Sequence, residues 1–502
     1  MENLKNLTKN KHFILFLLAI FSIFLACLSK DYDYDLYARL IVGEHFFKTG
    51  WIAYEDFLSY TPTHLWFDHE WGASLFFYAF LKLFGNFGLI LIYAILMFLT
   101  SFFIIKTQQL QKHAYPTSLA FMSVFLIIFF HQNPSIVRCH MFSFMFFSML
   151  IYFLEKTRIK NSNILWLMPL ITVIWNNIHG GVVSGLGIIF IYLVGEILSK
   201  KHWLKYFLVL LISTPLLAIN PYGVSYLEFL ISANTKNRYY ITEWWDVFAM
   251  RHVRYYYPQF FVSIFTVFFI LTKFIENKKL EITKFLVLLV TTLLGTIHVK
   301  LLSLPIIILA SLYYNDIMHL FNKNFIKFLN KLAVVIITFS ILYIPLTNPT
   351  IARTDLKKYP VKEVEFLKIN NIKGNIATLF GLGSYVSYKL YPNNLIYMDG
   401  RYEEVYDDEI FNDLISFETA NKNWDNILKF YPTNILMPEI KSKIYKHLKS
   451  NSKDWIEVYS GECVGIFLPK QKINKNKKLL IPNDDINYYR QREFLNNGKF
   501  GE

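Results

Sequence analysis

Long runs of apolar residues, separated by short polar segments, limit how this chain can fold more than any other feature. The runs follow neither the 2.0 period of a half-buried strand nor the 3.6 period of a surface helix. A helix needs roughly 20 apolar residues to cross a bilayer core of about 30 Å. Because 54% of the 502 residues are hydrophobic and only 18% are charged, a disordered chain is excluded and a purely soluble one is disfavoured. The sequence therefore predicts a polytopic α-helical membrane protein.

The number and length of these runs predict about 11 transmembrane helices. The runs cover residues 12–28, 87–105, 116–131, 141–154, 164–176, 181–198, 203–219, 257–272, 285–299, 301–318 and 332–346. The first run follows three lysines and so resembles a signal peptide, but residues 25–27 are a poor lipoprotein cleavage site, and we interpret the run as a retained anchor. The shorter run at 71–84 predicts an interfacial helix that lies against the membrane.

The positive charge indicates the topology of the chain. Residues before 352 carry a net charge of +11, and the remainder carry +3. With a cytoplasmic N-terminus, eighteen Lys and Arg residues fall in inner loops and ten in the longer outer loops. The positive-inside rule then predicts a multi-pass protein of the cytoplasmic (inner) membrane with an extracytoplasmic C-terminal domain. The basic residues form no stripe interleaved with aromatic residues, so nucleic acid is not an expected partner.

The apolar runs stop near residue 352, where short strand-like and helical runs begin to alternate. We expect a transmembrane domain at 1–351 with a large first outer loop at 29–86, a soluble α/β domain at 352–470, and a polar, Lys-rich tail at 471–502. Strands are expected at 375–379, 395–398, 434–437 and 464–468. The Gly-Leu-Gly-Ser segment at 381–384 predicts a turn that opens a helix, because it lacks a dinucleotide fingerprint and a P-loop lysine.

The first outer loop is acidic, with eight carboxylates between residues 31 and 72. Asp33 and Asp35 follow the first helix, and in an extended segment their side chains would point to one side. Such a pair could bind a divalent cation (Mg²⁺ or Mn²⁺) or supply a catalytic base, while a solvated acidic loop is the competing interpretation. Asp56, His69 and Glu70 are expected as supporting titratable groups, the last two among aromatic residues where unpaired charge is costly.

Polar clusters recur at the predicted outer ends of the helices. Each cluster alone is typical of a helix cap or an interfacial anchor, but their convergence on one side of the bilayer favours a site. A cationic set at this depth could bind the phosphate of a lipid carrier. The expected phosphate-binding residues are Arg138, His140, His298 and Lys300. The expected substrate-binding residues are Asn176, His179, Asn220, Glu243 and Trp244.

A series of motifs in chain order resembles a family of bacterial membrane proteins that look like the GT-C superfamily of glycosyltransferases. The motifs are Asp33-Tyr34-Asp35, Gly43-Glu44, Gly50, Asp56, Ser59-Tyr60-Thr61, His69-Glu70-Trp71, Arg138, residues 175–181, residues 220–223, Glu243-Trp244 and Asp399-Gly400-Arg401. The resemblance implies a polyprenyl-phosphate-linked sugar donor and a catalytic acid in the first outer loop. Asp33 or Asp35 would be that acid, and Asp56 and Glu70 would be the second acids of the loop. Segment 37–39 departs from the aromatic residues and histidine that are common in relatives.

We therefore expect a cell-envelope glycosyltransferase that moves a sugar from the lipid-linked donor to a glycolipid, polysaccharide or protein acceptor. A transporter or flippase of lipid-linked saccharides is the alternative, although it should place polar residues at the bilayer midplane, where these runs are apolar. A third interpretation is a non-catalytic membrane protein of glycan assembly.

Overall fold

The computed structural model describes residues 11–29, 32–111, 116–133, 137–236, 238, 241–249, 257–277, 281–347, 356–473, 478–485 and 488–489. The chain divides into two compact units. The first unit contains residues 1–29 and 90–348, and the second contains residues 30–89 and 349–502. The expected domain boundary near residue 352 falls close to this division. Segment 30–89, which we expected to belong to the transmembrane domain, clusters instead with the C-terminal residues.

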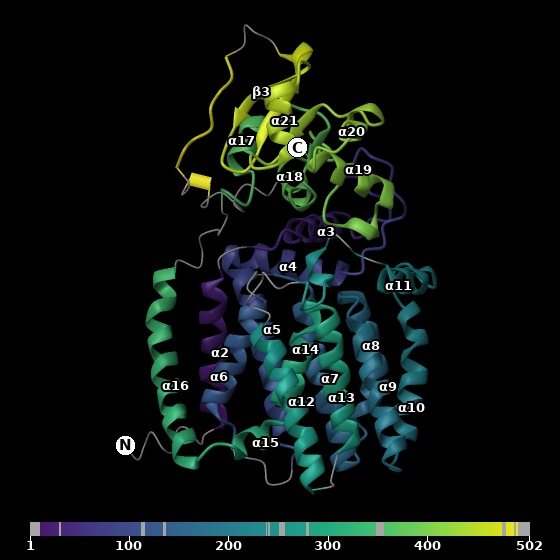
Figure 1. Ribbon diagram of the computed structural model, residues 1–502, viewed down its shortest axis with the longest axis vertical. Helices are drawn as coiled ribbons and strands as arrows, with labels where there is room; N and C mark the ends of the chain where they lie inside the picture. The colour runs from purple at the N-terminus through teal and green to yellow at the C-terminus, as the bar shows by residue number, and fades with distance from the viewer. Residues whose placement is uncertain are drawn as a thin grey trace. The chain divides into compact units, whose positions relative to one another are not determined.

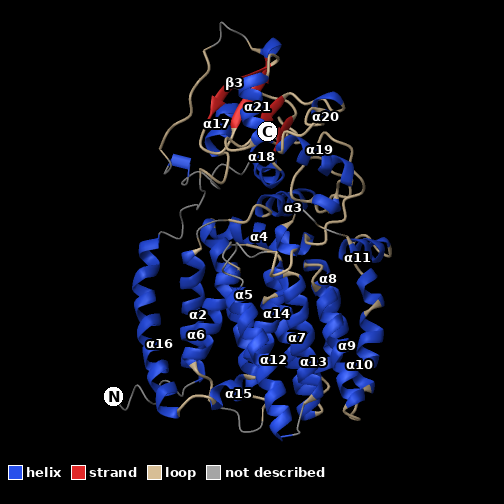
Figure 2. Cartoon of the chain, in the orientation of Figure 1, coloured by secondary structure: helices blue, strands red, loops and turns tan. Residues whose placement is uncertain are grey.

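The first unit is helical (Figures 1 and 2). Its α-helices are α2 (Lys11–Leu28), α5 (Asn86–Gln108, which begins in the second unit), α6 (Leu119–Gln132), α7 (His140–Lys160), α8 (Met168–Ile178), α9 (Val182–Leu198), α10 (Leu204–Ser213), α11 (Ser225–Thr235), α12 (Tyr257–Asn277), α13 (Ile282–Ile297), α14 (Ser303–Leu312), α15 (Tyr314–His319) and α16 (Lys323–Tyr343). Its 3-10 turns are η1 (Ile164–Leu167), η2 (Pro215–Ala218), η3 (Thr242–Trp244), η5 (Val299–Leu301) and η6 (Ile344–Thr347). Every predicted apolar run therefore contains helix.

Three of the described helices, α2, α5 and α16, are long and apolar enough to cross a membrane. Seven further apolar helical segments are shorter, at 10–17 residues. Some of the predicted spans are divided: α8 continues from the 3-10 turn η1, α10 gives way to η2 at Pro215, and the run at 301–318 divides between α14 and α15. Proline has no N–H group to continue a helical ladder, which explains the second break. The described helices thus support an association with the membrane.

Two buried glutamates of the first unit are paired with polar side chains. Arg158 makes two hydrogen bonds of 2.9 Å to Glu155, which also accepts one from the Tyr192 hydroxyl at 2.8 Å. Glu196 accepts a hydrogen bond of 2.8 Å from the Thr283 hydroxyl. These pairs compensate the cost of placing carboxylates inside an apolar bundle.

The second unit combines helices with a small sheet. Its helices are α3 (Leu36–Thr49), α4 (Trp71–Phe84), α17 (Val361–Ile369), α18 (Gly383–Leu390), α19 (Asp408–Glu418), α20 (Asn426–Lys429) and α21 (Lys443–Asn451), with 3-10 turns η7 (Phe380–Leu382), η8 (Tyr402–Glu404) and η9 (Lys470–Lys472). Its strands are β1 (Ile376–Thr378), β2 (Ile435–Met437), β3 (Trp455–Ser460) and β4 (Gly465–Pro469). The order is β1-β2-β4-β3, with β1 and β2 parallel and the other pairs antiparallel.

Three of the four predicted strands are confirmed, and so is the turn at 381–384 that opens α18. The prediction of a strand at 395–398 was wrong, because this segment forms only isolated bridges from Ile396 to Ser59 and to Ile376. Strand β3 was missed. Its side chains are at most half-buried, so it carries no continuous apolar run.

The bridges at Ile396 explain why the first outer loop belongs to this unit. Ile396 donates its backbone N–H to the Leu58 carbonyl at 3.0 Å, and its own carbonyl accepts the Tyr60 N–H at 3.0 Å. Further along, His64 N–H donates to the Val405 carbonyl at 3.0 Å. Segment 58–64 of the loop therefore runs beside segment 396–405 and extends the sheet edge at β1.

Part of the predicted tail is also attached to the second unit. Asn370 exchanges two hydrogen bonds with the backbone of Leu480, at 2.8 and 2.9 Å. Residues 474–477, 486–487 and 490–502 of the tail lie outside the described residues, as does Asp31 of the outer loop.

Candidate functional site

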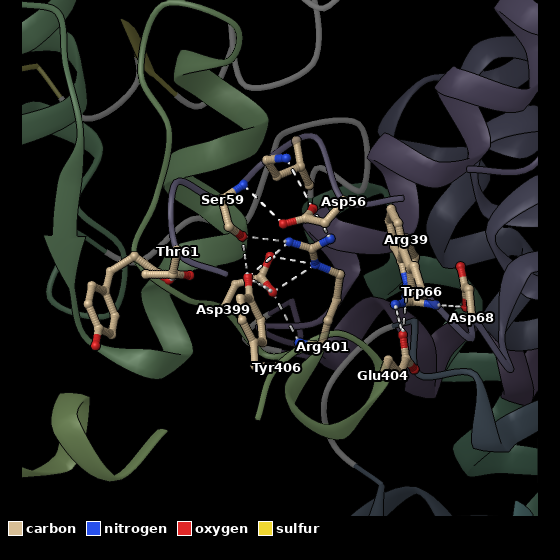
Figure 3. Close-up of polar contacts among 12 residues, drawn as sticks. Arg39, Asp56, Ser59, Thr61, Trp66, Asp68, Asp399, Arg401, Glu404 and Tyr406 are labelled. Carbon is tan, nitrogen blue, oxygen red and sulfur yellow. Dashed lines mark hydrogen bonds and ion pairs between the residues drawn. The ribbon is translucent and has the colours of Figure 1, made fainter. Parts of the chain in front are cut away.

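A group of buried charged side chains in the second unit, which we call the Arg401 cluster, connects the first outer loop to the C-terminal residues. Arg401 Nε lies 2.8 Å from Asp399 Oδ1, and its Nη1 lies 2.6 Å from Asp56 Oδ1. Its Nη2 donates to the Tyr406 hydroxyl at 3.0 Å, and that hydroxyl lies 2.6 Å from Ser59 Oγ. Figure 3 shows Asp56, Ser59, Asp399 and Tyr406 converging on the Arg401 guanidinium. One cation thus joins two carboxylates that are distant in sequence.

The electrostatics of this cluster make it a structural ion pair. The side chains of Arg401, Asp56 and Asp399 are fully buried. Burial alone would raise the pKa of Asp56, but the Arg401 charge, together with hydrogen bonds from Arg401, Ser59 and the Leu58 N–H, outweighs burial and lowers the pKa. Burial would lower the pKa of Arg401, but the charges of Asp399 and Asp56 outweigh it, and the pKa is raised. Asp56, which we expected as a supporting acid, is therefore ionised, paired and hidden from a substrate.

A second group, the Arg39 cluster, lies in the same unit and contains Arg39, Asp68, His69, Glu70 and Glu404. Arg39 Nη1 contacts Asp68 Oδ1, and its Nη2 lies 3.4 Å from Glu404 Oε2. His69 lies between two carboxylates, with Nδ1 2.8 Å from Glu404 Oε1 and Nε2 3.7 Å from Glu70 Oε1. Glu70 also lies near Arg39, at 3.6 Å from Nε. The structure thus brings together two predicted residues, His69 and Glu70, with three that were not predicted as site residues.

These contacts shift the charge states of the Arg39 cluster. Burial would lower the pKa of His69, but Glu404 and then Glu70 outweigh it and raise the pKa to about 9. Burial raises the pKa of Asp68 to about 6, an effect that Arg39 partly offsets. The pKa of Glu404 is lowered, because Arg39 and His69 outweigh the effect of burial. At neutral pH His69 is an imidazolium held between two glutamates.

His69, Glu70 and Glu404 are also residue types that bind metals, and their ligand atoms lie within 4.8 Å of one another. The geometry favours the imidazolium over a metal for two reasons. The two glutamates face opposite ring nitrogens, and only a protonated ring can donate through both nitrogens at once. In addition, the Arg39 cation contacts Glu404 and would repel a metal ion there.

Asp33 and Asp35, the predicted catalytic acids, lie at the start of α3. Asp35 is exposed at the N-cap position, and Asp33 is half-buried with Oδ1 accepting the Asp35 N–H at 3.1 Å. This hydrogen bond turns Asp33 toward the backbone. Among the described residues, the group of three metal-ligand types includes neither of them. The expected Mg²⁺ or Mn²⁺ site at these two acids stays a prediction.

A cationic group surrounds Trp244 in the first unit, and we call it the Trp244 cluster. Arg138 makes two contacts with the carboxylate of Glu243, at 2.5 and 2.8 Å. The Trp244 ring has the Lys300 ammonium 5.1 Å from its centre. The His298 ring lies 5.2 Å from Trp244, and His298 Nδ1 is 2.7 Å from the Trp244 carbonyl. Five of the predicted residues are thus brought together.

Sequence reasoning missed a further member of the Trp244 cluster. The Arg238 guanidinium lies 4.2 Å from the centre of the Trp244 ring and contacts the Ala233 carbonyl. Arg138, Arg238 and Lys300 carry three positive charges against one negative charge on Glu243, which leaves these four side chains with a net charge of +2. Arg238 is recognised as a member by its cation–aromatic contact with Trp244, and that contact depends on tertiary packing.

The remaining predicted residues of the first unit make internal contacts. His140 Nε2 lies 2.9 Å from Asn133 Oδ1. His179 Nδ1 accepts the Gly181 N–H at 2.8 Å and lies 2.8 Å from Ser143 Oγ, so the neutral ring carries its proton on Nε2. Asn176 and Asn220 both donate to the Leu217 carbonyl, at 2.9 and 2.6 Å. These asparagines connect α8 to the turn after η2, which is a structural role.

No protein-family model matches this chain, and a search of the curated proteins found no match. Glu404 is the residue that sequence reasoning could least have found. Glu404 meets Arg39 across 365 positions of the sequence, so no local spacing could have connected them.

Proposed function

We propose that this protein is a polytopic membrane glycosyltransferase of about 11 spans with a GT-C-like architecture. It would transfer a sugar from a polyprenyl-phosphate-linked donor to a glycolipid, polysaccharide or protein acceptor on the extracytoplasmic face of the cytoplasmic membrane. The order of motifs in the sequence and the three apolar spans support this proposal.

The observation that carries the proposal is the solvent exposure of the Asp35 side chain. Asp56 and Glu70, the second acids of the loop, contact arginines, whereas Asp35 is exposed at the start of α3. An exposed carboxylate can accept the proton of an acceptor hydroxyl, which a carboxylate buried against a guanidinium cannot do. Asp35 is therefore assigned as the base, and Asp33, which accepts its backbone N–H, supports its position.

The proposed reaction is a single displacement. The acceptor oxygen attacks the anomeric carbon of the sugar, its proton passes to Asp35, and the bond from the sugar to the lipid phosphate breaks. The phosphate leaves with the electron pair of that bond. The Trp244 cluster of the first unit carries excess positive charge, which suits an anionic ligand such as a lipid phosphate. No step requires a metal ion.

The test is mass spectrometry of surface glycans and lipid-linked saccharides from cells with the intact gene, no gene, or Asp35→Asn. Glu55→Gln is the matched control, because Glu55 is an exposed acid of the same loop. We expect a glycan short by one sugar, and accumulated donor, in the deletion and in Asp35→Asn only. Full transfer by both Asp33→Asn and Asp35→Asn would contradict the assignment. An unchanged glycan with intermediates trapped on the cytoplasmic side would indicate a flippase.

A further inference from the structure

The turn Asp399-Gly400-Arg401 is anchored on both sides. Asp399 and Arg401 are locked together in the Arg401 cluster, with Arg401 Nε 2.8 and 3.0 Å from the two carboxylate oxygens. On the neighbouring side, α18 begins directly against the turn, since a Cβ atom at Gly383 would lie 2.8 Å from Asp399 Cβ. The backbone of Gly400 therefore has little freedom to move.

The space that a side chain at Gly400 would need is taken by Asp35. A Cβ atom at Gly400 would lie 2.5 Å from Asp35 Oδ1 and 3.9 Å from Ser384 Oγ. Gly400 is not among the glycines with positive φ, so backbone conformation does not demand a glycine here. The close approach of the Asp35 carboxylate is what requires it.

We propose that Gly400 is a positioning residue for the base Asp35. By lacking a side chain, Gly400 lets the Asp35 carboxylate lie directly against an anchored turn, and this close approach limits where the carboxylate can lie. A base must lie within hydrogen-bond reach of the proton it removes, and a displacement of about 1 Å can cost 100-fold in rate. This inference rests on the proposed function.

The substitution Gly400→Ala tests it with little risk of unfolding the protein. The added methyl group would meet the end of an exposed side chain, which can swing aside, and would leave the buried turn in place. Gly381→Ala is the matched control. A Cβ atom there would lie 3.7 Å from the Tyr34 ring, which is an ordinary contact beside Asp35 in the sequence.

Transfer is measured as sugar incorporated into surface glycan per amount of membrane-inserted protein. We expect Gly400→Ala to lose at least tenfold of the transfer rate and Gly381→Ala to stay within twofold of wild type. The double variant Asp35→Asn/Gly400→Ala should be no slower than Asp35→Asn alone, because both changes act through one carboxylate. An additional tenfold loss in the double variant would overturn the inference.

A second readout does not depend on activity. Cys27, Cys139 and Cys463 are buried, so a charged maleimide should label mainly an introduced cysteine in Asp35→Cys. If Gly400 sets the position of this side chain, adding Gly400→Ala should change the labelling rate severalfold, while adding Gly381→Ala should not. Equal rates in all three proteins would overturn the inference.

The two levels of proposal fail in different ways. Loss of transfer in Asp35→Asn but full transfer in Gly400→Ala removes the role of Gly400 and leaves the proposed function standing. Full transfer in Asp35→Asn removes the assigned base, and the positioning role with it.

Discussion

The guanidinium of Arg401 lies 4.5 Å from the centre of the Trp66 ring. The indole N–H of the same Trp66 donates to Glu404 Oε2 at 3.2 Å, so this side chain contacts both the Arg401 and the Arg39 clusters. Trp66 is 1% exposed and belongs to the first outer loop, whereas Arg401 and Glu404 belong to the C-terminal segment. The two charge clusters are therefore coupled through one aromatic ring.

We expect Trp66→Phe to destabilise the second unit by about 1–3 kcal/mol, because it keeps an aromatic face for Arg401 but leaves Glu404 without the indole donor. Thermal unfolding of the detergent-solubilised protein would measure this loss. Trp51→Phe is the control, because Trp51 is 75% exposed in the same loop. An equal effect of both substitutions would contradict the coupling.

Arg401→Met should be more damaging, by about 3–5 kcal/mol, because it leaves Asp56 and Asp399 buried without a cation. Lys429→Met provides the comparison. Lys429 pairs with Asp425 but is 58% exposed, and such pairs contribute about 0–1 kcal/mol. Limited proteolysis of the two variants in native membranes would measure the difference. Similar protease resistance would show that the buried pair is not needed for the fold.

The charge on His69 predicts a pH dependence of stability. Its pKa in the folded protein is raised to about 9, above the 6.5 expected for an unfolded chain. Protonation therefore stabilises the fold fully below about pH 6.5, and this contribution is lost as the pH rises through 9. Comparison of melting temperatures of wild type and His69→Gln between pH 6 and pH 10 would test this. The gap between them should narrow at high pH, and a constant gap would refute the charged state.

Treatment with a chelator distinguishes a protonated His69 from a His69 that binds a metal ion. If His69 is protonated and pairs with Glu70 and Glu404 without a metal ion, treatment with EDTA at pH 7 should leave the melting temperature unchanged within about 1 °C. Added Zn²⁺ should likewise have no stabilising effect. A lower melting temperature in EDTA, restored by Zn²⁺ and absent from His69→Gln, would show that a metal replaces the proton.

The sequence predicted the elements of the fold better than their connections. The ranges of helix, the turn before α18 and three of the four expected strands follow from local apolar runs and glycine positions, which act over a few residues. The segment at 395–398 looked like a strand because it is apolar and flanked by polar residues. In the structure it makes only isolated bridges, to Ser59 and to Ile376.

The candidate residues divide in the same way. Residue type and order were enough to select Asp33, Asp35, His69 and Glu70 for chemistry, and the cations near Trp244 for anion binding. The sequence did not predict the charge states of the acids and of His69, or which acids are exposed to a substrate. Those properties depend on Glu404 and Arg401, which contact the outer loop from the C-terminal part of the chain. Asp56 shows the difference most clearly. It has the same chemistry as Asp35, but it is buried against a guanidinium.

The sequence by itself thus determined that this protein is helical, that it contains apolar spans, and that it ends in a smaller mixed α/β region, because these properties follow from hydrophobicity and local periodicity. Only the tertiary structure decided that the first outer loop belongs with the C-terminal segment and which of its acids remain exposed. Burial and ion pairing depend on contacts across hundreds of residues, and hydrophobic patterning along the chain does not encode which partners meet.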